Sequence, residues 1–322
     1  MTTAPLPPAV VTVTPNPGLD VTYVLPASTQ TSEVSRASRS TLEASGKGVN
    51  VSRALHAVGV PTCAVLPVGG PTGRCLVELL EDDQVPHRII PQQGHTRINT
   101  TALTPGAETG KLNGPGARLT MDEQEALLAT TQLAIEDARS GHAETWLAVC
   151  GSLPPGVAPG LVTELVHLAH AHGAKCAVDA SGEALEAALK ANADLLAPNR
   201  DELAEVLHGG TRIGGLEDTV DVAVSLSKET GSHLLISMGA DGALYADGVQ
   251  ALHATAPPLT PVNTAGAGDA LLAGWLTTTA DARSRLALAV RWGRSACLSP
   301  TTVDSRPGSR DPQRVTVTDF AR

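Results

Sequence analysis

Short apolar runs rich in β-branched residues alternate with helical patterns along most of the chain, and this alternation limits the folds open to it. The first run, Ala9–Val13, stops before Pro15, as a buried strand does. Further strands are predicted at residues 63–68, 145–149, 175–178, 195–197 and 233–237, with a β-rich stretch at 243–254. Helices are predicted at residues 45–59, 72–80, 121–138, 161–172, 185–189, 201–207, 220–230, 266–276 and 282–297. Continuous apolar strands separated by helices indicate an α/β protein whose sheet is mostly parallel and covered on both faces.

Two stretches rich in threonine and serine interrupt this alternation, roughly at residues 18–43 and 88–116. The first contains the alternating apolar positions Val21, Tyr23 and Leu25, which is typical of strands exposed on one side. We therefore predict that both stretches belong to a small additional sheet. No shift in composition marks a boundary, so residues 1–322 are interpreted as one domain.

The composition excludes several kinds of partner. Lys and Arg number 23 against 33 Asp and Glu, and the resulting charge of −10 argues against a general affinity for nucleic acid or anionic membranes. No apolar run approaches the ~20 residues of a transmembrane helix, and the start lacks the features of a signal peptide. The five cysteines are odd in number and form no CxxC pair, so we expect reduced thiols in a cytoplasmic protein.

Motifs of several common enzyme classes are missing from the sequence. There is no GxxxxGK[ST] phosphate loop, no GxGxxG after the first strand, no HExxH zinc motif and no GxSxG nucleophile motif. The ten histidines are scattered without metal-ligand spacing. P-loop nucleotide hydrolases, zinc hydrolases and α/β-hydrolases are therefore disfavoured.

The strongest chemical signal is the segment at residues 263–269, NTAGAGD, which leads directly into an apolar helix pattern. Gly266, Ala267 and Gly268 are small, so they leave backbone N–H groups exposed at a helix start, where the helix dipole also favours an anion. Asp269 follows in the first turn. Such a turn can hold a transferring phosphoryl group while the carboxylate accepts a hydroxyl proton. The alternative is an ordinary glycine-rich helix start with a first-turn acid.

Four motifs, in this order along the chain, resemble those of the PfkB family of carbohydrate kinases. Residues 45–55 (SGKGVNVSRAL) are similar to the family's amino-terminal signature, and residues 264–269 (TAGAGD) to its carboxy-terminal one. Between them, residues 197–202 (APNRDE) resemble its Asn-x-x-Glu motif, and residues 237–242 (SMGADG) its nucleotide-side glycine loop. The resemblance covers nearly the whole chain. It implies a ribokinase-like three-layer α/β/α sandwich with a mostly parallel central sheet and a small β lid, and it implies ATP and Mg²⁺ as cofactors.

Further segments resemble the branch of this family that phosphorylates hexose phosphates: residues 14–20 (TPNPGLD), Lys47 within GKG, residues 96–99 (TRIN) and residues 150–156 (CGSLPPG). This branch implies ATP-dependent phosphorylation of a ketohexose phosphate, with D-fructose 1-phosphate converted to fructose 1,6-bisphosphate as the first interpretation. The alternatives are the tagatose-6-phosphate kinase and minor 6-phosphofructokinase activities. A non-catalytic sensor of sugar phosphates is an alternative from a different class, disfavoured by the intact Asp269 and its glycine turn.

The resemblance also implies roles for individual residues. The catalytic group comprises the base Asp269 and the backbone N–H groups of Gly266, Ala267 and Gly268. The residues expected to bind the sugar phosphate are Asp20, Gly46, Lys47, Gly48, Asn50, Arg97, Arg36 and Ser152. Those expected to bind the nucleotide are Asn199, Ser237, Gly239, Ala240, Gly242, Thr264, Gly266 and Gly268. Glu202, together with Asn199, is expected to organise Mg²⁺, and the lid strands are expected to form a homodimer interface.

Positive charge near the sugar carries weight in so acidic a chain, because a phosphorylated sugar needs fixed cations. Lys47 and Arg97 are the expected phosphate clamp, with Arg36 as a third member. The alternative for these three is a solvated surface cation. For Glu202, the alternative to a role at Mg²⁺ is that it caps the start of a helix.

Three places depart from the family pattern, one of them the run at residues 69–73, which lacks the Asp that is typical after Gly. Ala197 stands where related kinases have Lys before Pro-Asn, and the segment at residues 111–116 (KLNGPG) has Gly114 in place of a Glu. All three differences bear on the substrate more than on the reaction.

Overall fold

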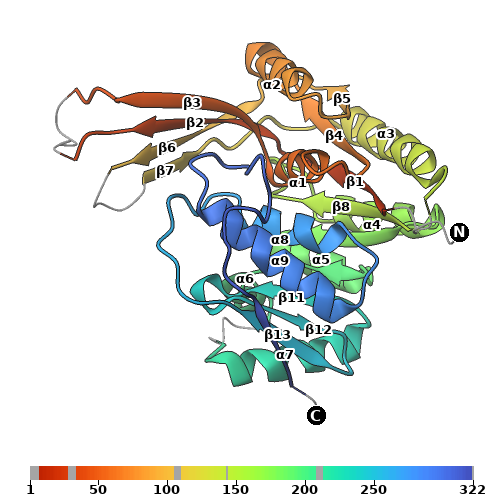
Figure 1. Cartoon of the computed structure of the whole chain (residues 1–322). Coiled ribbons are helices and arrows are strands. Elements are labelled where there is room, and N and C mark those ends of the chain that lie inside the picture. Colours follow the sequence, from red (N-terminus) through yellow and green to blue (C-terminus); the bar gives the residue numbers. More distant parts are fainter. Residues whose placement is uncertain (1–6, 28–33, 105–109, 143, 208–212, 321–322) are drawn as a thin grey trace, which may run out of the picture.

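The computed structural model describes residues 7–27, 34–104, 110–142, 144–207 and 213–320. The strands of its large sheet are β1 (Ala9–Val13), β4 (Thr62–Val68), β5 (His87–Pro91), β8 (Thr145–Cys150), β9 (Lys175–Asp179), β10 (Leu195–Leu196), β11 (His233–Ser237), β12 (Ala243–Ala246), β13 (Ala251–Thr255) and β14 (Thr316–Asp319). Over these described ranges their order is β14-β13-β12-β11-β10-β9-β8-β1-β4-β5 (Figure 1). Neighbours from β11 to β5 run parallel, whereas β12, β13 and β14 are added antiparallel at one edge.

Helices cover both faces of this sheet. One layer contains α3 (Met121–Arg139), α4 (Gly160–Ala171), α5 (Gly182–Lys190), α6 (Arg200–Val206) and α7 (Leu216–Thr230). The other contains α1 (Lys47–His56), α2 (Gly70–Asp82), α8 (Ala267–Leu276) and α9 (Ala282–Cys297). Alternate strand residues face the two layers, so Val11 and Val13 pack under the first layer and Val10 under the second. Burial on both faces explains why these strands are apolar throughout.

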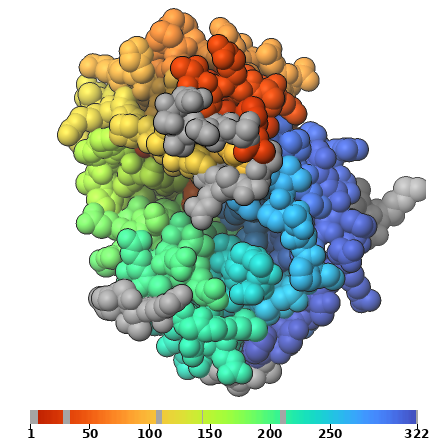
Figure 2. Space-filling model, turned by 90° about the vertical axis from the view of Figure 1, so that its left-hand side faces the viewer, coloured from red at the N-terminus to blue at the C-terminus, as the bar shows by residue number. Residues whose placement is uncertain are grey.

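A second, smaller sheet forms a lid that projects from the body of the molecule (Figure 1). Its strands, among the residues described, are β2 (Gly18–Val24), β3 (Arg39–Ser45), β6 (Arg97–Leu103) and β7 (Gly110–Asn113), in the order β3-β2-β6-β7. Asp20 pairs with Glu43 on one side and with Asn99 on the other, so these three polar side chains share one face. The opposite face carries Val21 and Leu42 beside Thr100. Figure 2 shows the molecule from the lid side, with the lid strands above the carboxyl-terminal half.

The structure confirms the predicted α/β architecture and corrects it at two places. Residues 88–91, predicted as part of the lid, lie instead in β5 at the edge of the large sheet. The reason is the burial of Ile90, which belongs to the same core as Val65 of β4. Strand β14 was absent from the prediction because its sequence, TVTD, is short and polar. Residues 28–33 and 105–109 of the predicted lid lie outside the described residues.

Among the described residues, no helix has both the length and the apolar character needed to span a membrane.

Candidate active site

The glycine turn predicted to bind an anion lies at the start of α8. Gly266 caps the helix with a φ of 77°, in the left-handed region that favours glycine. A Cβ at this position would overlap the carbonyl oxygen of Thr302, so the turn is also closely packed from behind. No atom of the described residues lies within 4 Å of the Cβ position at Gly268, which leaves that side of the turn open to them. The first N–H groups of α8 have no acceptor within the helix and lie at the positive end of its dipole, a position that favours an anion.

Asp269 lies in the first turn of α8 and is buried, with 7% of its surface exposed. Asn50 of α1 donates a hydrogen bond from Nδ2 to the Asp269 carboxylate at 2.7 Å, which fixes the orientation of that carboxylate. Burial, followed by the negative charge of Asp179, raises the pKa of Asp269 to about 7, while Asn50 and Lys47 oppose the rise. A carboxylate with this pKa can accept a proton near neutral pH and release it again.

Lys47 at the first position of α1 contacts carboxylates. Its Nζ lies 2.6 Å from Asp179 Oδ1 and 3.9 Å from Glu202 Oε1. Burial alone would lower the pKa of Lys47, but the charge and hydrogen bond of Asp179 outweigh it and raise that pKa. The predicted member of the phosphate clamp therefore lies among the acids around Asp269. Asp179 was missed from the sequence, although its place at the carboxyl end of a predicted parallel strand was an available signal.

Asn199 and Glu202 form a capping box at the start of α6. The Asn199 N–H donates to Glu202 Oε2 at 2.8 Å, and the Glu202 N–H donates to Asn199 Oδ1 at 2.8 Å. Both residues predicted to organise the metal ion, Asn199 and Glu202, thus stabilise the start of α6. The capping box uses Oε2 of the Glu202 carboxylate. The other oxygen, Oε1, is the one that faces Lys47.

The sugar-side residues gather where the lid joins the large sheet. Gly18 of β2 pairs with Arg97 of β6, and Arg97 Nη1 donates to the carbonyl of Gly114 at 3.3 Å. Burial lowers the pKa of Arg97, and the negative charge of Asp20 opposes that change. Asn99, which the prediction left out of the site, donates from Nδ2 to Asp20 Oδ1 at 2.8 Å.

Several buried polar atoms in this region have no protein partner. Among the described residues, eight side-chain N or O atoms are buried without a hydrogen bond, and half of them belong to Thr14, Asn50, Arg97 and Asn99. An unsatisfied buried polar atom is costly, and four of them lie around the joint between the lid and the large sheet. This clustering was not visible in the sequence, since the four residues come from three separate segments.

The remaining sugar-side predictions have different placements. Gly46, with a φ of 124°, and Gly48 pack tightly against the segment that follows β1, where a Cβ would meet Thr14 at 2.6 Å and 2.5 Å respectively. Ser152 accepts a 3.4 Å hydrogen bond from Asn16, which also donates to the carbonyl of Pro115 at 3.1 Å.

Arg36 is not brought together with Lys47 and Arg97. It is exposed and precedes β3, whereas Lys47 follows the other end of that strand. Six residue steps along β3 separate the two ends by about 20 Å.

The residues predicted to bind the nucleotide line a cavity of about 450 Å³ on the other side of the glycine turn. Six predicted residues contribute to its wall: Ser237, Gly239, Ala240, Gly242, Thr264 and Gly268. The wall also includes Leu271, Arg294 and Cys297, which the prediction did not name. Asn199 lies next to Ser237 through an isolated parallel bridge. The glycine turn and Asp269 thus stand between this cavity and the sugar-side residues.

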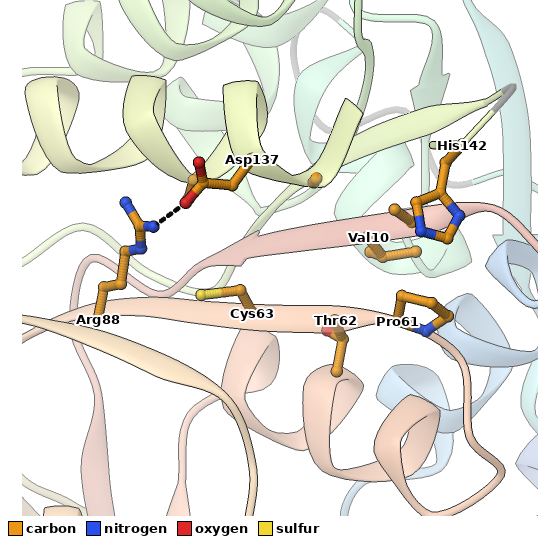
Figure 3. Close-up of a pocket in the computed structure, with 10 residues that line it drawn as sticks. Val10, Pro61, Thr62, Cys63, Arg88, Asp137 and His142 are labelled. Atoms are coloured by element: carbon orange, nitrogen blue, oxygen red, sulfur yellow. Dashed lines mark hydrogen bonds and ion pairs between the residues drawn. The ribbon is translucent and has the colours of Figure 1, made fainter. Parts of the chain in front are cut away.

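A separate cavity of about 280 Å³ lies at the amino ends of β1 and β4, beneath α3 (Figure 3). Its wall includes Cys63 and an ion pair between Arg88 and Asp137, and Figure 3 shows Cys63 and the ion pair at one end and His142 at the other. None of the predicted site residues contributes to it.

Comparison with known proteins decides the family. The family model described as "pfkB family carbohydrate kinase" matches residues 18–307. The chain belongs to the pfkB family of carbohydrate kinases. It is therefore an ATP-dependent sugar kinase, and its fold is the ribokinase-like α/β fold of the solved members.

Named relatives of this pfkB kinase cover most of its length. It is 32% identical to the ATP-dependent 6-phosphofructokinase isozyme 2 of Escherichia coli over 88% of this chain and 90% of the relative. It is 34% identical to a 1-phosphofructokinase of Haloferax volcanii over 83% of each chain. The structure of Escherichia coli phosphofructokinase-2 in complex with substrates and products superposes with a TM-score of 0.83, at 31% identity, over 92% of this chain and 95% of that one.

Proposed function

We propose that this pfkB kinase acts as one kinase domain and transfers the γ-phosphoryl group of ATP to a ketohexose phosphate, converting D-fructose 1-phosphate to fructose 1,6-bisphosphate. The observation that carries this proposal is the position of Asp269, buried between the nucleotide-side cavity and the cluster of unsatisfied polar atoms on the sugar side. The similarity to a 1-phosphofructokinase supports the choice of substrate.

Transfer in this site needs one proton acceptor and one anion-binding turn. The Asp269 carboxylate accepts the proton of the attacking hydroxyl as the new O–P bond forms and the bond between the γ-phosphorus and ADP breaks. The N–H groups of Gly266, Ala267 and Gly268 stabilise the negative charge on the transferring oxygens. ATP lies in the cavity beside Ser237 and Thr264, so that its γ-phosphate reaches the turn.

The carboxylates of Asp179 and Glu202 fit a Mg²⁺ ion. Both offer oxygen ligands, and both already hold a cation, since the Lys47 ammonium lies 2.6 and 3.9 Å from them. An ion held by these two carboxylates, beside the Lys47 ammonium, would neutralise charge on the phosphates of ATP. Asn199 acts on this site through the capping box, which orients Glu202.

The sugar phosphate binds beneath the lid. Asp20 and Asn50 accept and donate hydrogen bonds with sugar hydroxyls, and Arg97 binds the phosphate. Ser152, Gly46 and Gly48 shape the floor of the site through their contacts with Asn16 and Thr14. Lys47 contributes positive charge from its position beside Asp179 and Glu202. Arg36 lies too far along the lid to reach the phosphate of the same sugar within one chain.

A substrate panel tests the proposal. ADP release with Mg·ATP would be measured with fructose 1-phosphate, fructose 6-phosphate, tagatose 6-phosphate and free fructose. We expect kcat/KM for fructose 1-phosphate to exceed the others by about 100-fold, which corresponds to ~2.7 kcal/mol of transition-state discrimination. A preference for fructose 6-phosphate would favour the second candidate, 6-phosphofructokinase, which the similarity to isozyme 2 supports. Binding of the sugars without turnover would indicate a sensor.

The pH dependence of kcat should follow the Asp269 carboxyl. Below its pKa of about 7 the group is protonated and cannot accept a proton, so kcat is expected to fall as pH decreases through 7 and to level off above it. The measurement is kcat at saturating substrates across about pH 5.5–9, with product formation followed directly. A flat profile over the acidic half of this range would contradict the role of Asp269 as base.

We propose that two chains associate through the outer face of the lid. Val21 pairs with Leu42 on one side and with Thr100 on the other, and Thr100 pairs with Leu112, so these side chains share one face. Leu42 is 45% exposed and Leu112 is 74% exposed. Exposed apolar side chains gathered on one face of a sheet favour burial against a second copy.

A charge on this face should separate the two chains. Leu112→Glu is expected to lower the mass in solution from that of a dimer toward the 32.9 kDa of one chain, because a carboxylate would be buried without a partner. Sedimentation equilibrium measures the mass. Val249→Glu is the matched control, since Val249 is 84% exposed in the turn between β12 and β13, away from the lid. A wild-type protein that sediments as a monomer would refute the proposed interface.

A cytoplasmic location is part of the proposal. All five cysteines, each in the described part of the chain, are free thiols, which suits a reducing compartment.

A further inference from the structure

Glu43 is a buried acid on the lid strand β3 that the proposed reaction does not use. It lies in the same row of the lid sheet as Asp20 and Asn99, on the polar face, and only 8% of its surface is exposed. A carboxylate is costly to bury unless its charge and hydrogen bonds are satisfied. Its contacts therefore show what holds it there.

One contact of Glu43 crosses to the carboxyl-terminal part of the chain. Glu43 Oε2 accepts a hydrogen bond from the backbone N–H of Thr302 at 3.3 Å. The other oxygen, Oε1, lies 3.6 Å from Nη1 of Arg53 on α1. Arg53 is itself held by the carbonyl of Ala44 and by Asp83, so it fixes Glu43 from the side of the body.

Thr302 lies directly behind the glycine turn. Its carbonyl oxygen occupies the space that a Cβ of Gly266 would need. Thr302, Gly266, Asn50 and Asp269 line the same small space of about 10 Å³, so the segment around Thr302 lies against both the turn and the base. The position of the Thr302 backbone therefore sets the position of Gly266, the residue from which the N–H groups of the turn project.

We propose that Glu43 is a positioning residue that links the lid strand to the glycine turn through Thr302. The inference rests on the proposed function, since it concerns the turn that receives the phosphoryl group. The carboxylate holds the Thr302 N–H, and the backbone of Thr302, whose carbonyl oxygen packs behind Gly266, keeps the turn in the geometry that stabilises the transferring oxygens. Loss of the acceptor lets the turn relax, and a small misplacement of catalytic donors lowers the rate strongly.

Two substitutions of Glu43 test the link. Glu43→Ala removes the acceptor, and we expect kcat to fall by about 30- to 100-fold with the KM for ATP changed by less than about 2-fold. Glu43→Gln keeps an amide oxygen that can accept the Thr302 N–H, so we expect it to restore kcat to within about 3-fold of wild type. If Glu43 served only to stabilise the fold, its loss would not lower kcat selectively while leaving the KM for ATP almost unchanged.

A control separates the Thr302 contact from the ion pair. Asp83→Asn removes the other carboxylate on Arg53 and is expected to leave kcat unchanged. Equal losses in Glu43→Ala and Glu43→Gln would overturn the inference, because the Arg53 pair alone would then explain them. An unchanged kcat in Glu43→Ala would overturn it as well.

Amide hydrogen exchange gives a readout that does not require turnover. The backbone amide of Thr302 should exchange faster in Glu43→Ala than in wild type or Glu43→Gln, as measured on peptides that cover residues 299–305. Unchanged exchange would overturn the inference whatever the activity. A wild-type protein that phosphorylates none of the sugars would instead overturn the proposed function, and this outcome is distinct from both results for Glu43.

Discussion

Replacing Asp269 by Asn is expected to lower kcat by about 10²- to 10⁴-fold, with the KM for ATP almost unchanged. Asparagine has nearly the same shape and can still accept the hydrogen bond that Asn50 donates at 2.7 Å. It cannot accept the proton of the attacking hydroxyl. The nucleotide cavity is lined by other residues, so binding of ATP should persist.

The experiment measures kcat by ADP release and ATP affinity by equilibrium titration of the same variant. Asp201→Asn is a matched control, because Asp201 is also a first-turn acid of a helix but is exposed. It should retain wild-type kcat. A loss of less than tenfold in Asp269→Asn would exclude proton transfer to this carboxylate as an important part of the rate.

The second large effect is expected from Arg97→Ala. Removing this cation should raise the KM for a phosphorylated ketose by about 30- to 700-fold, which corresponds to the ~2–4 kcal/mol of a charge-assisted contact. Turnover of free fructose, which has no phosphate, should change little. The effect is expected to be large because, among the described residues, Arg97 forms no ion pair with a carboxylate and its Nη1 has only a long contact with the carbonyl of Gly114, so its charge is available for the phosphate.

Steady-state kinetics with the phosphorylated and free sugars would measure this difference. Arg88→Ala is the control, since Arg88 pairs with Asp137 at the cavity on the opposite end of the strands. If both sugars lost efficiency equally in Arg97→Ala, the damage would lie in the lid joint and phosphate recognition would have to be placed elsewhere.

The sequence was most informative where a local pattern carries the structure. Ala9–Val13, His233–Ser237 and Ala282–Cys297 have the predicted bounds, because their apolar spacing and end residues are local properties. The prediction placed β5 in the wrong sheet because its five residues are equally typical of a strand in either sheet. Only the burial of Ile90 against the large sheet decides between them.

The candidate site was predictable in part for the same reason. Asp269 and its glycine turn form one continuous segment, so their juxtaposition follows from the sequence. The orientation of Lys47 toward Asp179 depends on two elements that are 132 residues apart, and no local pattern reports it. Asn99 and Glu43 entered the site through strand register, which fixes their face only once the lid sheet is paired.

The contacts that complete the site also determine when it can form during synthesis. Asn50 and Asp269 are 219 positions apart, and Glu43 and Thr302 are 259 apart. The base and the segment behind its turn arrive only with the last part of the chain. A nascent chain that has not yet reached Asp269 and Thr302 would therefore carry the lid strands without the means to transfer a phosphoryl group.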